Sequence, residues 1–135
     1  MFWFSYIKTC FIIIIMTYTL IIPIYNEKRT LLTLIKKLDR LDDKIEIIII
    51  DDGSNDGTKD LLIESNQFII IRNESNLGKG ISIRKGVDLA SNQNIILMDG
   101  DLEVDIDEIP KLLTIFENIN CDALVGIRWE EDSNL

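Results

Sequence analysis

The chain has 135 residues, 47% apolar and 27% charged, so it is long enough for one domain with a hydrophobic core and too short for two. Its 14 Lys and Arg residues against 23 Asp and Glu residues give a net charge of −9, which argues against a nucleic-acid-binding protein. Because there is no histidine, a Ser-His-Asp triad and a His-ligated zinc centre are excluded. Cys10 and Cys121 form no CxxC pair, and we expect two buried thiols.

Residues 1–17 form an apolar N-terminal segment, and the rest of the chain, residues 18–135, is expected to be one domain. The uninterrupted apolar run that starts at Cys10 has about 15 residues, fewer than the ~20 that a spanning helix needs. Two interpretations stay open: a short membrane-associated anchor, or residues that precede the true start of the protein.

Strands and helices are expected to alternate along residues 18–128. Continuous β-branched runs, such as Glu46 to Ile50, are typical of strands that are buried on both faces. Asn26 is a plausible N-cap for a first helix with leucines at helical spacing. The expected strands are 18–24, 46–50, 68–71, 95–98 and 123–127, and the expected helices follow Asn26 and cover 58–65, 81–91 and 110–118. This order predicts an α/β fold, with a mostly parallel sheet and helices on both faces.

Polar motifs follow three of the expected strands, at the point where each strand ends. They are Pro23-Ile24-Tyr25-Asn26-Glu27, Asp51-Asp52-Gly53-Ser54 and Asp99-Gly100-Asp101-Leu102-Glu103. Because parallel strands place their carboxyl ends on one edge, where ligands bind in such sheets, the three motifs should converge on one crevice. A fourth loop, residues 76–80, leads into a helix, where its backbone N–H groups and Lys79 could face an anion.

Asp99 and Asp101 are two carboxylates one residue apart at a strand end, and Glu103 could add a third oxygen. Carboxylates held close together repel each other unless a cation lies between them, and an oxygen-only ligand set suits Mg²⁺ or Mn²⁺. Such a metal would neutralise the charge of a leaving diphosphate. The alternative is that these carboxylates are only solvated surface of an acidic protein.

Taken together, the ordered motifs resemble the family 2 glycosyltransferases of the GT-A type, over roughly residues 18–128. Within the family the chain looks most like the dolichyl- or polyprenyl-phosphate sugar transferases. The matching runs are PIYNE (23–27), IIIIDDGSNDGT (47–58), NLGKG (76–80), Arg84 with Gly86, and MDGDLE (98–103). The resemblance implies a Rossmann-like nucleotide-sugar-binding fold, of which we expect the donor-binding part to be present and the acceptor-side part to be missing.

The resemblance also implies roles for individual residues. Asp51 would hydrogen-bond the base, and Asp52 would support that loop. Asp99 and Asp101 would be the metal motif, with Glu103 as a further ligand and Gly100 between them at the nucleotide sugar. Pocket residues would be Pro23, Tyr25 and Glu27, with Lys79 and Arg84 near the phosphates. Arg128 would lie near the acceptor phosphate.

The activity implied is inverting transfer of a sugar from a nucleotide sugar, of the GDP-mannose or UDP-glucose type, to a polyprenyl or dolichyl phosphate. The site would lie at the cytoplasmic face of a membrane, peripheral or anchored, with no nucleic-acid partner. Two alternatives stay open. One is an inactive nucleotide-sugar-binding fragment that needs a separate membrane or acceptor subunit, and the other is a transferase acting on a hydroxyl of a growing glycan.

Overall fold

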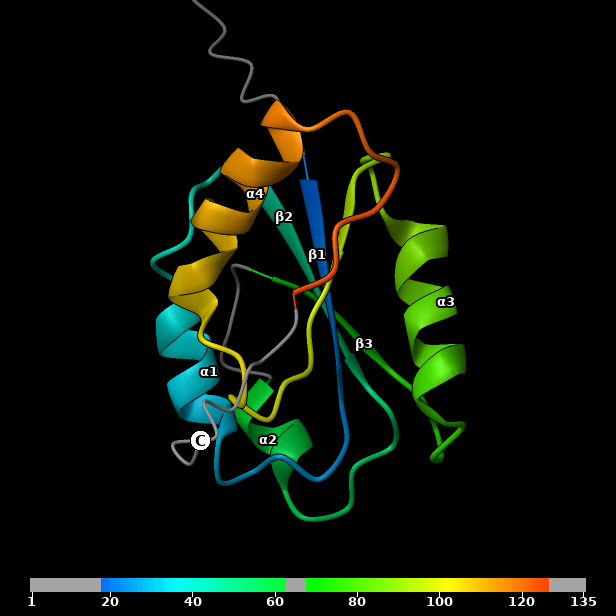
Figure 1. Cartoon of the computed structure of the whole chain (residues 1–135). Coiled ribbons are helices and arrows are strands. Elements are labelled where there is room, and N and C mark those ends of the chain that lie inside the picture. Colours follow the sequence, from blue (N-terminus) through cyan, green and yellow to red (C-terminus); the bar gives the residue numbers. More distant parts are fainter. Residues whose placement is uncertain (1–17, 63–67, 127–135) are drawn as a thin grey trace, which may run out of the picture.

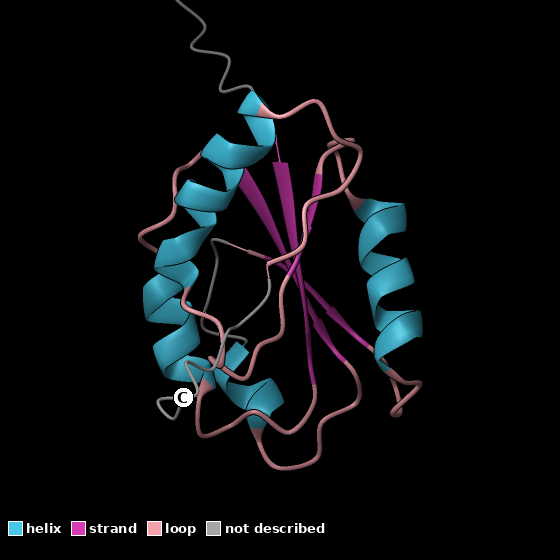
Figure 2. Ribbon diagram, viewed as in Figure 1, coloured by secondary structure: helices cyan, strands magenta, loops and turns pink. Residues whose placement is uncertain are grey.

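A computed structural model describes residues 18–62 and 68–126 and shows a central sheet between two layers of helices (Figure 1). The ribbon in Figure 2 shows the same layers coloured by secondary structure. In chain order the elements are β1 (Tyr18–Ile24), α1 (Leu31–Leu38), β2 (Ile45–Asp51), α2 (Thr58–Leu62), β3 (Ile69–Arg72), α3 (Lys79–Leu89), β4 (Ile95–Leu97), the 3₁₀ turn η1 (Ile106–Glu108) and α4 (Ile109–Asn118).

The sheet has the strand order β3-β2-β1-β4, and every pair is parallel. The register pairs Ile24 with Asp51, and Asp51 in turn with Arg72, so β1, β2 and β3 end at one level. That edge is the lower one in Figure 1, where the chain leaves β1, β2 and β3. The predicted α/β fold with a parallel sheet is therefore confirmed.

The two faces of the sheet bury separate sets of side chains, because successive residues of a strand point to opposite faces. Leu20, Ile22 and Ile24 of β1 pack with α1 and η1 in the larger cluster. Ile21 packs with Ile48 and Ile50 on the other face, which α3 covers. Gly86 lets α3 approach closely, since a Cβ there would lie 2.6 Å from Ile21 Cγ2. Burial on both faces explains the unbroken isoleucine runs.

Two predictions made from the sequence are wrong: the N-cap of the first helix and the last strand. Asn26 does not cap α1: its φ is +55°, and α1 begins after Thr30. Its side chain instead accepts a hydrogen bond from the backbone N–H of Asn55. The predicted strand at 123–127 is not a strand over residues 123–126, and Ile127 lies outside the described residues. Apolar residues alone do not make a strand when no neighbouring backbone pairs with them.

Other boundaries shift by one or two residues. Helix α3 begins at Lys79 rather than at 81, and β3 ends at Arg72 rather than at 71. The thiol of Cys121 was expected to be buried but is partly exposed, because it lies in a loop beyond α4. Cys10 and the candidate anchor, residues 1–17, lie outside the described residues. Among the helices that are described, none is long and apolar enough to cross a membrane.

Candidate functional site

The edge of the sheet where β1, β2 and β3 end carries a polar network. It is built around two adjacent carboxylates, Asp51 at the end of β2 and Asp52 directly after it. Asp52 is 4% exposed, yet it accepts hydrogen bonds at both oxygens. Its Oδ1 accepts from the backbone N–H of Leu77 at 2.9 Å and from Asn73 Nδ2 at 2.6 Å, and its Oδ2 accepts from the N–H of Gly78 at 2.9 Å. Asp52 thus fixes the loop that leads into α3.

Burial raises the pKa of Asp52, but the hydrogen bonds from Leu77, Asn73, Gly78 and Ser82 outweigh it and hold that pKa below its usual range. The carboxylate is therefore ionised at neutral pH. Asn73 is itself buried and donates to Ser82 Oγ at 3.0 Å, while its Oδ1 accepts from Lys85 Nζ at 2.6 Å. The network extends in this way into α3.

Asp51 has the opposite arrangement, because one of its oxygens lacks a donor within the described part of the chain. Its side chain is fully buried, and its Oδ1 accepts from the backbone N–H of Ser54 at 2.9 Å. Among the described residues its Oδ2 has no hydrogen-bond partner. The cation beside it is Arg72, whose Nε lies 3.6 Å from Oδ2, too far for a hydrogen bond. A buried acceptor with no partner is costly unless a ligand completes it.

The loop after β1 is tied to the loop after β2. The backbone N–H of Asn26 donates to Ser54 Oγ at 2.8 Å, and Asn26 Oδ1 accepts from the N–H of Asn55 at 2.9 Å. Of the predicted pocket residues, Tyr25 lies in this loop and is exposed, whereas Pro23 is the last residue but one of β1 and is partly buried. The carboxylate of Glu27 accepts from the hydroxyl of Thr30 at 2.7 Å, at the start of α1. The bonds from Asn26 place the first two motifs side by side.

The acidic loop after β4 reaches the same edge through an ion pair. Lys79 Nζ lies 2.5 Å from Asp99 Oδ1, which joins the first residue of α3 to the first predicted metal ligand. Asp101 Oδ1 accepts from the backbone N–H of Glu103 at 2.9 Å, so that side chain shapes its own turn. The described residues do not bring three of these carboxylates together as a metal-binding group. Asp99 is half exposed, and its carboxylate is paired with the ammonium of Lys79.

Gly100 has a packing role that the sequence did not indicate. A Cβ at this position would lie 2.4 Å from Ile24 Cγ2, so only glycine lets the acidic loop lie against the end of β1. Arg84 lies on α3 and is exposed. Arg128 falls outside the described residues.

Two polar residues of the edge were missed by sequence reasoning. Arg72 ends β3 and Asn73 follows it, as the other motifs follow β1, β2 and β4. The same rule, polar residues at the carboxyl end of a parallel strand, would have found them.

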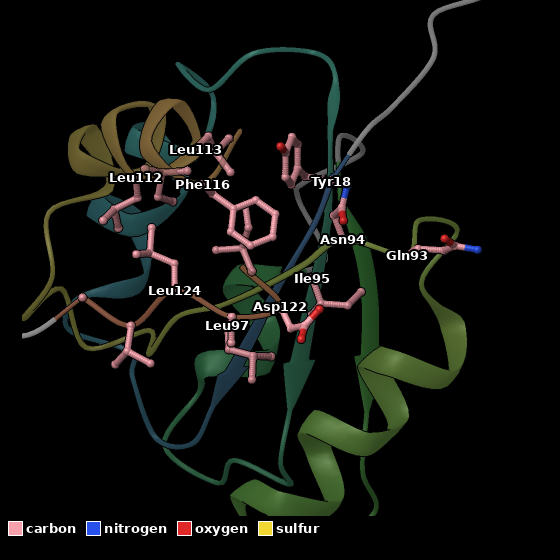
Figure 3. Close-up of a pocket in the computed structure, with 15 residues that line it drawn as sticks. Tyr18, Gln93, Asn94, Ile95, Leu97, Leu112, Leu113, Phe116, Asp122 and Leu124 are labelled. Carbon is pink, nitrogen blue, oxygen red and sulfur yellow. The ribbon is translucent and has the colours of Figure 1, made fainter. Parts of the chain in front are cut away.

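A cavity of about 510 Å³ lies elsewhere, along the outer edge of β4 (Figure 3). Phe116 and Leu113 of α4, Leu97 of β4 and Leu124 line it, together with Asp122. Of the predicted site residues that the structure describes, none lines this cavity. It is a groove between the sheet edge and α4, separate from the carboxylate network.

Comparison with known proteins gives the same family as the motifs. The family model described as glycosyl transferase family 2 matches residues 19–135. An uncharacterized protein of Methanocaldococcus jannaschii is 38% identical over 117 residues, which are 80% of this chain and 50% of that protein. The dodecaprenyl-phosphate galacturonate synthase of Rhizobium johnstonii is 30% identical over 129 residues, 87% of this chain and 37% of that enzyme. The chain therefore spans half or less of the length of these relatives.

Solved structures share the fold. Glucosyl-3-phosphoglycerate synthase of Mycobacterium tuberculosis, in complex with Mn²⁺, UDP and glucosyl-3-phosphoglycerate, matches with a TM-score of 0.63 and 24% identity, over 74% of this chain and 39% of that one. A Pyrobaculum calidifontis mannosyltransferase in complex with GDP-Man and Mn²⁺ matches with a TM-score of 0.57 and 22% identity, over 62% and 27% of the two chains. The four-stranded parallel sheet is thus the Rossmann-like core of GT-A glycosyltransferases. With its ordered motifs, its fold and the match over residues 19–135, the chain belongs to glycosyltransferase family 2.

Proposed function

We propose that the edge formed by Asp51, Asp52, Lys79 and Asp99 binds a nucleotide sugar, and that the protein transfers the sugar to a polyprenyl phosphate with inversion. The observation that carries the nucleotide role is Asp51 Oδ2, an acceptor that is buried and has no hydrogen-bond partner among the described residues. An N–H group of a nucleotide base is the kind of donor that would complete it. Its neighbour Asp52 holds the adjacent loop by backbone N–H bonds, so the acceptor belongs to a preorganised edge.

The diphosphate would lie towards Lys79 and the start of α3. The N-terminus of a helix favours negative charge, and Lys79 is the first residue of α3. Arg84 lies further along the same helix and would contribute positive charge near the phosphates. Tyr25 and Glu27, in the loop tied to Ser54, would line the nucleotide pocket together with Pro23, near the end of β1.

A divalent cation, Mg²⁺ or Mn²⁺, fits the acidic loop by its donor set. Asp99 is half exposed at this edge and lies beside the positive charge of Lys79. Asp99 and Asp101 would hold the metal, with Glu103 as a further oxygen ligand. When bound, the metal would supply charge neutralisation to the leaving nucleoside diphosphate. The M. tuberculosis and P. calidifontis proteins were both solved with Mn²⁺, which supports this assignment.

The acceptor is assigned from the relatives. The R. johnstonii enzyme is named for a dodecaprenyl phosphate, and other relatives are named undecaprenyl-phosphate sugar transferases. An acceptor of that kind is already ionised at neutral pH, so its oxygen could attack the anomeric carbon without a strong general base. Arg128 would lie near the acceptor phosphate. Such an acceptor would place the protein at the cytoplasmic face of a membrane.

The test is a transfer assay with UDP- and GDP-sugars, Mn²⁺ and polyprenyl phosphate in detergent or vesicles. Transfer that falls at least about tenfold in Asp99→Asn and Asp101→Asn, but not in Asp105→Asn, supports the proposal. Asp105 is the matched control because it lies in the same acidic loop but pairs with Lys37 at 2.8 Å. Nucleotide binding without transfer would indicate the alternative, a binding module that needs a separate acceptor subunit. Transfer to a glycan hydroxyl alone would contradict the polyprenyl acceptor.

A further inference from the structure

The groove between β4 and α4 is apolar and open to solvent. Leu97 of β4 is 54% exposed, and Leu124 and Val125, in the loop after α4, are 38% and 77% exposed. All three line the groove, as does Phe116 of α4 (Figure 3). Large apolar side chains that gather in one exposed groove mark an interaction surface.

The same groove contains an open edge of the sheet. In the strand order β3-β2-β1-β4, the strand β4 is outermost, and it pairs with β1 on its inner side. None of the strands that the structure describes pairs with its outer side. The outward-pointing backbone N–H and C=O groups of such an edge are a template for another extended segment. The groove therefore offers both apolar side chains and backbone partners to an extended apolar chain.

The segment that precedes β1 fits this surface by its composition and by its attachment point. Residues 1–17 contain one charged residue, Lys8, and an unbroken isoleucine run at residues 12–15, which favours an extended strand. The segment joins β1 at Tyr18, which itself lines the groove and donates its hydroxyl hydrogen to Glu117 Oε1 of α4 at 2.9 Å. A segment that is tethered at the groove has a high effective concentration there.

The other end of the described chain also adjoins the groove, but the residues that follow it fit less well. Residues 127–135 follow Gly126, which lines the groove, and four of these nine residues are charged, three of them acidic. The groove already contains the carboxylate of Asp122. Burying further carboxylates there, against apolar side chains and another acid, would be costly. Charge and composition therefore favour the N-terminal segment as the occupant.

We propose that residues 10–17 fold back into the groove and lie along the outer edge of β4. The segment would run towards Tyr18 and so antiparallel to β4, because β4 is parallel to β1. Eight extended residues span about 26 Å, whereas the three residues of β4 span about 10 Å, so the segment is long enough to cover that edge. Of the predicted site residues that the structure describes, none lines the groove, so this interaction is independent of the proposed function.

The test is photo-cross-linking from the loop that enters the groove. A benzophenone maleimide is attached to Cys121, which is partly exposed, in the full chain carrying Cys10→Ser, so that one thiol is present. The protein is illuminated at high dilution and without membranes, and the cross-linked peptides are identified by mass spectrometry. We expect cross-links within the same chain to residues 10–15.

The matched control moves the label to the other side of β1. In Cys10→Ser, Cys121→Ser, Lys44→Cys the thiol lies at an exposed position next to Ile45, the register partner of Tyr18 on β2. A segment that moves freely about Tyr18 would reach both labels, whereas a docked segment would reach one. We expect the yield of cross-links to residues 10–15 to be at least about tenfold higher from Cys121 than from position 44.

A charge in the groove should release the segment. Val125→Asp changes a lining residue that is largely exposed, so we expect the fold to persist and the yield from Cys121 to fall several-fold. Ile115→Asp is the matched control, because Ile115 is exposed on α4 but does not line the groove, and its yield should equal that of the wild-type groove. Circular dichroism of each variant checks that the fold is retained.

Four results would overturn the inference. Equal yields from Cys121 and position 44 would show that the segment is not docked. Cross-links from Cys121 to residues 127–135 would assign the groove to the other end of the chain, and cross-links between chains would assign it to a second copy. Absence of the expected cross-links, together with flotation of the full chain with phosphatidylcholine vesicles, would show that the segment binds the membrane instead.

Discussion

Replacing Asp52 by Asn tests whether this carboxylate holds the candidate site together. The change keeps the shape of the side chain and removes its charge, and it turns one acceptor atom into a donor. The ionised carboxylate accepts from Asn73 Nδ2 and from the backbone N–H groups of Leu77 and Gly78. After the change the N–H of Gly78 would face an NH₂ group, or the new side chain would turn and abandon the other two donors.

The expected decrease in the free energy of unfolding follows from those hydrogen bonds. A hydrogen bond to a charged group contributes about 1.5–3 kcal/mol, and the Asp52→Asn variant would lose or weaken about two of them. The loop is only partly buried, so water can replace some of the loss, and we expect a decrease of about 3 kcal/mol in the free energy of unfolding. That is a large part of the roughly 5–15 kcal/mol that is typical of a domain. Urea denaturation of the wild type and the variant measures it.

The matched control is Asp56→Asn, in the loop after β2. Asp56 also accepts hydrogen bonds, from the backbone N–H and the hydroxyl of Thr58 at the start of α2, but it is only partly buried. Its replacement should lower the free energy of unfolding by less than that of Asp52, because water can replace the hydrogen bonds of a partly buried side chain. If Asp52→Asn costs no more than Asp56→Asn, then Asp52 does not hold the loop, and our description of the site is refuted.

The stabilisation by Asp52 should also depend on pH. Because the pKa of Asp52 is lower in the folded protein than in the unfolded chain, the unfolded chain takes up the proton first as the pH falls. The contribution is fully present above the unfolded pKa of about 3.9 and is lost as the pH falls through the folded pKa. The difference in unfolding free energy between wild type and Asp52→Asn should therefore shrink below about pH 4. A difference that stays constant down to about pH 2 would contradict the assignment.

Three further predictions concern the packing and hydrogen bonding of the fold. Gly86→Ala should destabilise by about 1–3 kcal/mol in thermal denaturation, because its Cβ would lie 2.6 Å from Ile21; Gly80→Ala in the same helix, with nothing within 4 Å, should stabilise by up to about 1 kcal/mol. Gly100→Ala should weaken nucleotide affinity as well as stability, measured by calorimetry and melting, because the acidic loop must move away from Ile24. Glu46→Gln should cost about 2–3 kcal/mol in urea, because Thr19 and Ser91 donate three hydrogen bonds to that buried carboxylate; a cost below about 1 kcal/mol would contradict its role.

The sheet could be predicted from the sequence because the residue pattern that marks a strand is local and recurs from strand to strand. Each buried strand is a run of β-branched residues, and the polar residues that follow mark where the strand ends. The parallel order then follows from the alternation with helices. The convergence of Asp51, Asp52 and Lys79 on one edge needs no more than that order, and the structure brings these residues together.

The details that sequence reasoning missed depend on long-range contacts. Asn26 fits the composition of a helix cap, but its partner is Asn55, 29 residues away. Gly100 fits the family motif, yet its reason is the close approach of Ile24. Residues 123–126 are apolar enough for a strand, but strand formation also requires backbone partners. Arg72 matters here through its distance from Asp51, which follows from sheet register and not from spacing along the chain.

The central claim is that one edge of this small sheet binds a nucleotide with the help of a divalent metal. Its most direct test is calorimetric titration of the purified chain with UDP and with GDP, each with and without Mn²⁺, for the wild type and Asp99→Asn. We predict that one of the two nucleotides binds, that Mn²⁺ strengthens its binding at least about tenfold, and that Asp99→Asn abolishes the effect of Mn²⁺ but leaves the fold intact. A folded wild-type chain that binds neither nucleotide, or that binds equally well without metal, would contradict the claim.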